Sequence, residues 1–542
     1  MPALVWAVTV LHTLLMLGFA VLYPPFLNPD EAQHVDLILA VQEEKVVWAP
    51  GERRVSQAIV TAFAEASIYG IGQGNPQAVP LGSATIRARE DRQSFRELGI
   101  DQPGPVTELP NQLVQHPPLY YALAAGVLEV LPGSDAYRWD VTLGILRVLG
   151  ALLVSPLPLL VFITGRKLSP ERPWVPVAAS SAVLLIPGLT RAGGSVNNDN
   201  LLILLSAALL VPVAALLATP ASPGRRTAWG RAAAIGVLMG LVAFTKGTGL
   251  VMLVLLGLAY GLACVRQRRV IWQEMLTVGI VATAVGGWWW VRNLLVYGTL
   301  QPIGLGAEAL ARVRGPAAPA DVERSAAGFV IRASWKLAQL FVGALGQFTP
   351  PRLSPWLVST MAVVAVVGVL AALVLRGAIR RADAVCFVVP VLFLYGYLLL
   401  AAYPWYLHNL SYPGLQGRYF YFLLPGLLLS VAAGWETLTP RVVRPVAPVA
   451  VCLAGVAMQA WAAWRIFSFL WDGLPGADWT VSSVERGVGV LVFYAPWPPP
   501  VTVAIPVAVT LAAGAVLLVA WRHVRGHLAA TARRTEAGPP VS

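Results

Sequence analysis

The chain has 542 residues, of which 57% are hydrophobic and only 12% charged, and its mean hydropathy is +0.67. Soluble domains carry about a quarter charged residues, so this composition excludes an ordinary water-soluble protein and indicates a polytopic membrane protein. The net charge of +12 does not indicate a nucleic-acid partner, because the basic residues form short clusters between apolar runs, as topogenic charges do.

Apolar runs long enough to span a bilayer, or nearly so, recur along the whole chain, since a transmembrane helix needs roughly 20 residues. We therefore predict an all-α polytopic membrane protein of about twelve transmembrane helices, forming a single domain over 1–521, with a disordered cytoplasmic tail at 522–542. The runs are 3–22, 141–164, 174–190, 201–218, 232–245, 249–265, 275–292, 356–375, 384–402, 419–438, 446–468 and 501–521.

A further apolar run, 117–131, decides the orientation of the chain. As a helix it is about 22 Å long, which is short of the roughly 30 Å of a bilayer core. If it does not span, five short loops on one side hold 14 basic residues, and the short loops on the other side hold three: Arg191, Lys246 and Arg418. The positive-inside rule then places both termini in the cytoplasm, and 117–131 is a helix at the membrane surface.

Three long segments face outward in this topology: 23–140, 293–355 and 469–500. The first is far longer than an ordinary connection and includes sequences typical of amphipathic surface helices. Long loops on a rigid scaffold often carry binding and catalytic residues. We therefore expect the function to be concentrated in 23–140.

This first outer segment opens with "YPPFLNPDEAQH", where Asp30 and Glu31 stand side by side as the chain leaves the membrane. Asn28 followed by Pro29 and then Glu31 is typical of a capping box, which would explain one acid. The alternative is a partly desolvated carboxylate that acts as a general base towards a hydroxyl. His34 lies one turn beyond Asp30 on the same helix face. It would orient the acid or an acceptor group, or serve only as an interfacial hydrogen-bonding residue.

Two more outward stretches are candidates for the same site. In "GGSVNNDN", Asp199 caps the next helix or, with Asn198, belongs to a polar patch at membrane depth, where such groups are costly. Asp30 and Asp199 together could hold a divalent ion such as Mg²⁺ or Mn²⁺ by oxygen ligands. In "QHPPLYY", His116 either marks a structural corner before two prolines or faces the same cavity as Asp30.

Three cations lie at outer ends of predicted spans, where topogenic charge is not expected: Lys246, Arg292 and Arg418. They either snorkel to the interface or bind phosphate, which arginine contacts bidentately and lysine as a point charge. Facing two acids across an outer cavity, they would suit a phosphate leaving group opposite a general base.

Five motifs in this order, "PDEAQH", "QHPPLYYAL", "SVNNDN", "WVRNLLVYG" and "QGRYFYFLLP", resemble the GT-C superfamily of membrane glycosyltransferases. They look most like a bacterial family of that superfamily known as a domain of unknown function. The order of elements matches over most of the chain, although no repeat-rich or soluble C-terminal domain is present as in some relatives.

The resemblance implies an inverting glycosyl transfer from a polyprenyl-phosphate-linked sugar to a glycan, lipid or protein acceptor, at the extracytoplasmic face of a bacterial inner membrane. It also implies that Asp30, with Glu31 as second choice, lies at the catalytic centre beside the donor phosphate. The alternatives are a transporter or flippase of lipid-linked sugars, an O-antigen-type polymerase or ligase, and a non-enzymatic scaffold. A transporter predicts charged residues within spans and repeat symmetry, and neither is evident.

Overall fold

The structure is a computed structural model, and it is all-helical as the sequence predicts. Apart from two isolated β-bridges, the secondary structure of the described residues consists of helices. The described residues are 2–44, 48–66, 88–100, 107, 109–218, 224–306, 310–311, 314–319, 321–343, 345–346, 352–471 and 480–536.

Within these ranges, ten helices are long and apolar enough to cross a membrane, and a bent pair adds an eleventh. The ten are α1 (Ala3–Leu22), α5 with α6 (Trp139–Val154, Leu157–Leu168), α9 (Asp199–Ala218), η6 with α11 (Gly247–Val251, Met252–Gln267), α12 with η7 and α13 (Trp272–Ala282, Thr283–Gly287, Trp288–Tyr297), α16 (Pro355–Val374), α17 (Arg381–Asn409), η8 with α18 (Gly417–Leu423, Leu424–Leu438), η9 with α19 (Arg444–Val446, Ala447–Leu470) and α21 (Pro499–Glu536). The remaining predicted run is α10 (Arg225–Ala243), which packs against α9 and α12. The count is therefore close to the twelve expected.

The bent pair interrupts the predicted run 174–190. α7 (Trp174–Ser181) continues as the short helix η5 (Ala182–Leu185), and α8 (Pro187–Gly193) then departs at an angle of 75°. Pro187 has no backbone N–H to continue the preceding helix, so the break falls where the sequence requires it. The turn carries α8 across the end of α1, which brings the residues after it to the outer helix ends.

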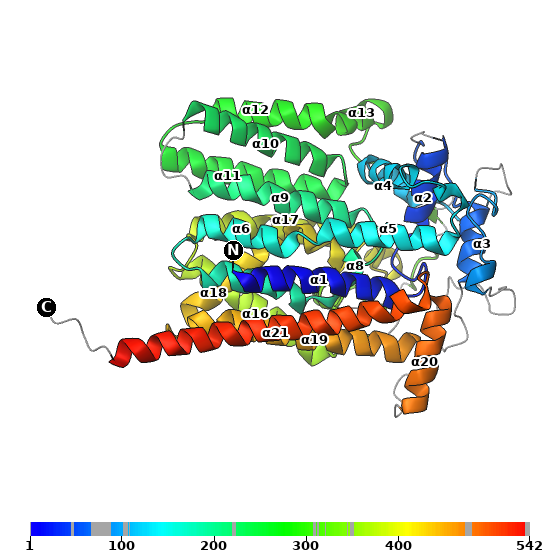
Figure 1. Cartoon of the computed structure of the whole chain (residues 1–542). Coiled ribbons are helices and arrows are strands. Elements are labelled where there is room, and N and C mark those ends of the chain that lie inside the picture. The colour runs from blue at the N-terminus through cyan, green and yellow to red at the C-terminus, as the bar shows by residue number, and fades with distance from the viewer. Residues whose placement is uncertain are drawn as a thin grey trace.

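Both ends of the described chain lie at one end of the helix bundle (Figure 1). α1 runs away from that end and α21 returns to it, and the two helices pack side by side. Helices α2, α3, α4 and α20 lie at the opposite end. This end is the one that the charge distribution predicts to be extracytoplasmic.

The first outer segment folds into α2 (Glu31–Glu44), α3 (Gln57–Glu65), η2 (Arg89–Asp91), η3 (Gln112–Gln115), α4 (Leu119–Glu129) and η4 (Ser134–Ala136). α4 has 11 residues, about 16 Å at 1.5 Å per residue, which is too short to cross a bilayer. It packs against α2 over a buried apolar cluster that includes Ile38 and Tyr120. The interpretation of 117–131 as a non-spanning helix therefore agrees with the structure.

A buried carboxylate ties the parts of this segment together. Asp36 of α2 accepts hydrogen bonds from the Arg53 guanidinium at 3.0 and 3.3 Å, from the Ser56 backbone N–H at 2.9 Å and from the Asn111 amide at 2.8 Å. Arg53 and Ser56 lie just before α3 and Asn111 just before η3, so Asp36 fixes α2 relative to both.

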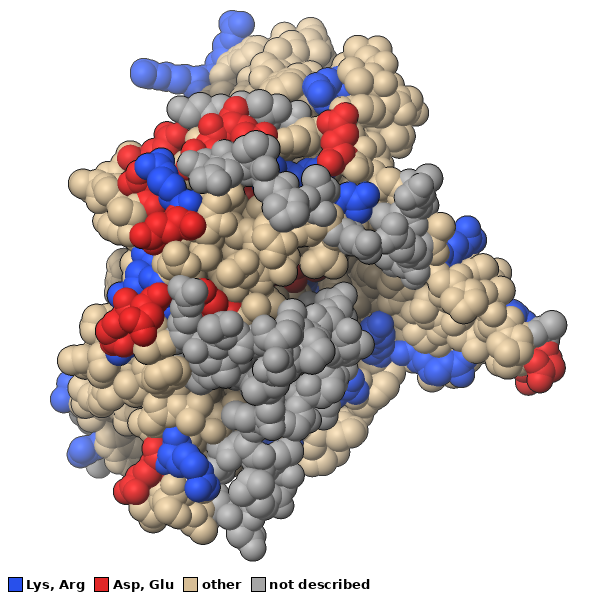
Figure 2. Space-filling model, turned by 90° about the vertical axis from the view of Figure 1, so that its right-hand side faces the viewer, with Lys and Arg blue, Asp and Glu red and all other residues tan. Residues whose placement is uncertain are grey.

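The two later outer segments contain α15 (Ala326–Val342) and α20 (Val481–Tyr494). Seen end-on, this side of the molecule carries interspersed acidic and basic side chains (Figure 2).

At the opposite end, α21 continues as a helix to Glu536, past the point where the sequence suggested a disordered tail. Residues 537–542 of that expected tail lie outside the described residues.

Candidate functional site

Close helix packing brings distant parts of the chain together at the outer end. A side chain at Gly194 would place its Cβ 2.5 Å from the Met16 carbonyl oxygen, and one at Gly417 would lie 2.1 Å from the Phe341 backbone nitrogen. Glycine is thus required where α8 crosses α1 and where η8 meets α15. These two contacts place the loop after α8 and the first turn of η8, which carries Arg418, near the end of α1.

Four charged side chains meet there in an alternating chain of ion pairs. The Arg418 guanidinium donates through Nη2 to the Asp30 carboxylate and through Nη1 to the Pro29 carbonyl at 3.2 Å, while its Nε lies 3.5 Å from Asp199 Oδ2. Lys246 Nζ donates to the other Asp199 oxygen, Oδ1, at 2.7 Å. The cluster therefore contains two cations and two carboxylates. The Asp30 side chain, at 28% exposed, is the most accessible of the four.

Glu31 lies in a different and fully buried setting. Arg147, from the middle of α5, donates to its carboxylate through Nε at 2.9 Å and Nη2 at 2.7 Å, and the Val196 backbone N–H donates at 3.1 Å. The same guanidinium also donates to three carbonyls where α1 ends, those of Ala20, Tyr23 and Pro24. Through Arg147, Glu31 therefore stabilises the turn between α1 and α2.

The turn that separates the two acids is not a capping box. α2 begins at Glu31, and Asp30 before it has a φ of 59°, in the left-handed region that costs a non-glycine residue energy. The Asn28 amide group donates to the Glu31 carboxylate, and its oxygen accepts from Arg191 Nε at 3.1 Å. Strained backbone at Asp30 points the two carboxylates to different partners.

Two histidines lie beside the cluster. His34 Nδ1 is 3.2 Å from the Tyr121 hydroxyl, and the two rings stack, which fits the interfacial hydrogen-bonding interpretation. Burial lowers the pKa of His34 well below its ordinary value, and the charges of Arg418 and Lys246 lower it further. Burial, followed by the charge of Lys246, likewise lowers the pKa of His116. Both imidazoles are therefore neutral at pH 7, and His116 Nδ1 has no hydrogen-bond partner among the described residues.

The loop that supplies Asp199 also holds Asn198. Its side chain is buried, and neither its amide nitrogen nor its oxygen has a hydrogen-bond partner within the described part of the chain. Asn197 and Asn200 instead bond back to the loop, to the Ala192 and Ser195 carbonyls, at 2.9 Å each. Buried amides without partners are uncommon, so Asn198 is a candidate for contact with a bound molecule.

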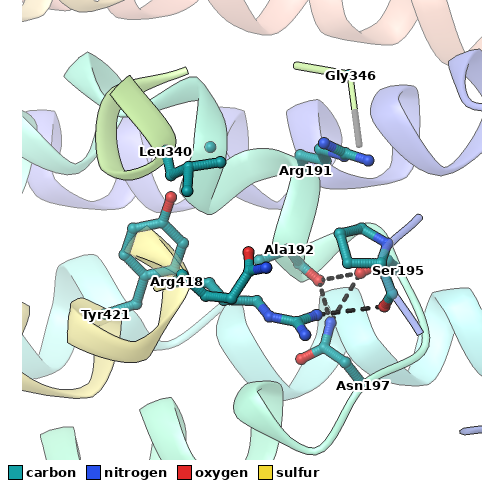
Figure 3. Close-up of a pocket in the computed structure, with 11 residues that line it drawn as sticks. Arg191, Ala192, Ser195, Asn197, Leu340, Gly346, Arg418 and Tyr421 are labelled. Atoms are coloured by element: carbon teal, nitrogen blue, oxygen red, sulfur yellow. Dashed lines mark hydrogen bonds between the residues drawn. The ribbon is translucent and has the colours of Figure 1, made fainter. Parts of the chain in front are cut away.

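Arg418 also lines a pocket (Figure 3). It holds about 470 Å³ of space, including the part open to solvent, between α8, η8 and the end of α15. Two arginines, Arg191 and Arg418, line it together with the polar residues Asn197, Gln416 and Tyr421, and none of its eleven described lining residues is acidic. The pocket is therefore suited to an anionic group.

Arg292 does not join this cluster. Its guanidinium packs over the Trp289 and Tyr297 rings of its own helix and bonds to Asn293 Oδ1 at 3.2 Å. The structure thus brings Lys246 and Arg418 together with Asp30 and Asp199, but it does not show the third expected cation, Arg292, in contact with them.

A divalent ion between Asp30 and Asp199 does not fit this arrangement, because both carboxylates face Arg418. Among the described residues, no group of three or more His, Cys, Asp and Glu side chains is placed to hold a metal. Mg²⁺ or Mn²⁺ thus remains an expectation of the sequence alone, which a test of activity after chelation would check.

Residues 13–427 match a family described as predicted membrane protein (DUF2142). The chain belongs to this family. This match confirms the prediction from the five motifs, which resemble a bacterial family known as a domain of unknown function. No curated protein matches the sequence of this DUF2142 member.

One solved structure similar to the DUF2142 chain is that of ArnT from Cupriavidus metallidurans, bound to undecaprenyl phosphate. The two share 13% sequence identity, with 96% of this chain and 78% of the ArnT chain covered and a TM-score of 0.44.

Two arginines of the DUF2142 site were not among the predicted site residues. Arg147 interrupts the apolar run 141–164, and an arginine inside a span is by itself a signal of a buried partner or a functional site. Arg191 was counted only as an outward charge, although the reasoning applied to Lys246 holds for it equally. Both could have been found from the sequence by asking which charges lie within or directly beside the apolar runs.

Proposed function

We propose that this protein is a glycosyltransferase that moves a sugar from a polyprenyl-phosphate donor to an acceptor hydroxyl at the outer face of the membrane. The observation that carries the proposal is the placement of Asp30. It is a partly exposed carboxylate at the outer helix ends, and it contacts a cation that also lines an acid-free pocket. A group-transfer reaction with a phosphate leaving group needs this combination of a base and positive charge.

In the proposed reaction, the acceptor hydroxyl oxygen attacks the anomeric carbon of the sugar, and Asp30 accepts the proton of that hydroxyl. The bond between the anomeric carbon and the phosphate oxygen breaks, and the polyprenyl phosphate leaves with the electron pair. Attack opposite the leaving group inverts the anomeric configuration. Arg418, supported by Lys246 and Arg191, stabilises the developing phosphate charge, which is the kind of interaction that usually contributes most to catalysis.

The location of the cluster suits a lipid-linked donor. A polyprenyl tail dissolves in the bilayer and its phosphate lies at the interface, and we expect the pocket near the ends of α1, α8 and η8 to lie at that level. The positive-inside rule predicts that this end is extracytoplasmic, and we propose a bacterial inner membrane as the location and a glycan, lipid or protein as the acceptor. A cysteine introduced at Val130, which is 77% exposed, should react with impermeant thiol reagents from outside the cell. Reaction only after permeabilisation would contradict this orientation.

A transporter predicts charged residues within spans, and Arg147 is one, but its guanidinium binds Glu31 and three carbonyls at the end of α1. Transporters bind their substrates near the midplane of the bilayer, between structural repeats, whereas the charges of Asp30 and Arg418 lie at the outer helix ends. An O-antigen-type polymerase or ligase would place its main outer loop late in the chain, whereas Asp30 belongs to the first outer segment.

The proposal is tested by transfer assays in nanodiscs with a panel of polyprenyl-phosphate sugars. Asp30→Asn is nearly isosteric but cannot accept the proton, so turnover should fall by about 10²–10⁴-fold, the usual contribution of general-base catalysis. Glu90→Gln is the matched control, because Glu90 is an outer-segment acid with a 73% exposed side chain. Wild-type turnover by Asp30→Asn would exclude Asp30 as the base and direct attention to Asp199.

A further inference from the structure

Arg418 both binds the Asp30 carboxylate and lines the pocket. Its Nη2 and Nη1 atoms bond to the Asp30 carboxylate and the Pro29 carbonyl, and the same side chain forms part of the pocket wall (Figure 3). The residue proposed as the base and the pocket proposed for the phosphate therefore share one cation. Any anion that binds Arg418 in the pocket competes with Asp30 for the same guanidinium.

The Arg418 guanidinium holds the Asp30 carboxylate against the turn at Pro29. In the proposed order of events, the carboxylate must leave this contact to meet the hydroxyl of the acceptor. Phosphate, in turn, binds arginine well through its several oxygens. In this structure the Asp30 carboxylate is bound to Arg418. A phosphate in the pocket would compete with Asp30 for the Arg418 guanidinium.

Competition would release Asp30 rather than Asp199. Asp199 is held by Lys246 at 2.7 Å as well as by Arg418, and its side chain is only 3% exposed. Within the described residues, the Asp30 carboxylate accepts hydrogen bonds from Arg418 alone, and it is 28% exposed on a strained turn. It is thus the less firmly held of the two carboxylates.

We propose that the Asp30–Arg418 ion pair is an autoinhibitory contact that the donor phosphate opens. The phosphate binds Arg418 in the pocket, and Asp30 is released to accept the acceptor's proton. This inference rests on the proposed function and adds an order of events to it. The donor binds first, and the base becomes active only when a phosphate is in place.

The test is the affinity for polyprenyl monophosphate, measured in nanodiscs of zwitterionic lipid for four proteins: wild type, Asp30→Asn, Arg418→Gln and the double variant. If Arg418 is free in about a tenth of wild-type molecules, Asp30→Asn should bind about tenfold more tightly, because the competing carboxylate is gone. In the Arg418→Gln background, Asp30→Asn should change the affinity little. Such non-additivity is what a double-mutant cycle measures for residues in contact.

Equal or weaker binding by Asp30→Asn than by wild type would overturn the inference. So would an equal tightening in both backgrounds, since that would reflect general repulsion of the phosphate by Asp30 and not competition for Arg418. Absence of binding in all four proteins, with unchanged melting temperatures, would instead contradict the proposed donor class itself. Glu90→Gln serves again as the control, and its affinity should match wild type.

Discussion

Asp30 and Glu31 are adjacent in the chain, yet the structure gives them opposite surroundings. Glu31 is buried, and a bidentate guanidinium, a backbone N–H and an asparagine amide surround its carboxylate. Asp30 is partly exposed and bound by a single arginine that also reaches a second acid. The difference shows that an acid pair is not one functional unit, because a single turn of strained backbone directs the Glu31 carboxylate to Arg147 and the Asp30 carboxylate to Arg418.

The largest expected effect separates the two acids by stability. Glu31→Gln leaves the Arg147 charge buried without its counter-ion, which should lower the free energy of unfolding by about 3–5 kcal/mol. Asp30→Asn should change it by no more than about 1 kcal/mol, because partly exposed ion pairs contribute little. Denaturant unfolding in detergent would measure both.

A double variant sharpens this prediction. Glu31→Gln combined with Arg147→Met removes both charges, so it should recover part of the stability that Glu31→Gln loses. If Glu31→Gln were as stable as wild type but inactive in transfer, the comparison would be reversed and Glu31 would be the base.

An intermediate effect is expected from the cations. Lys246→Met removes a positive charge beside the proposed phosphate site and should raise the KM for the donor about tenfold, or about 1.4 kcal/mol. Arg292→Met should leave the KM within about twofold, because Arg292 contacts only its own helix among the described residues. The reverse result would mean that Arg292 is the phosphate ligand that the sequence suggested.

The smallest effect concerns pH. The pKa values of His34 and His116 are lowered in the folded protein, so below about pH 6.5 the unfolded chain binds protons that the folded protein does not. Stability is therefore fully present above that pH and should fall by about 1 kcal/mol per histidine near pH 5.5.

Melting temperatures between pH 5 and 8 would show this slope. The double variant His34→Gln/His116→Gln should flatten it, whereas His523→Gln, which is exposed at the other end of the molecule, should not. An unchanged slope in the double variant would show that neither histidine is kept neutral by burial.

The sequence predicted those features that depend on local pattern. The spans follow from the length of apolar runs, the non-spanning α4 from its shortness, and the acid at the end of α1 from its place in the chain. Which charged residues pair with one another could not be predicted from the sequence. Glu31 meets Arg147 across 116 positions and Asp30 meets Arg418 across 388, and no periodicity specifies such contacts. Arg292 shows the same limit, since its side of the membrane can be inferred but not the face of the bundle that it joins.

The packing of α21 along α1 has a consequence for biosynthesis. α1 leaves the ribosome before α21, which begins at Pro499, and at 5–20 residues per second about half a minute to a minute and a half separates the two. During that time lipid must cover the face of α1 that α21 will occupy. α1 must therefore hold its own orientation in the bilayer until α21 arrives, and its 20 mostly apolar residues are long enough to do so.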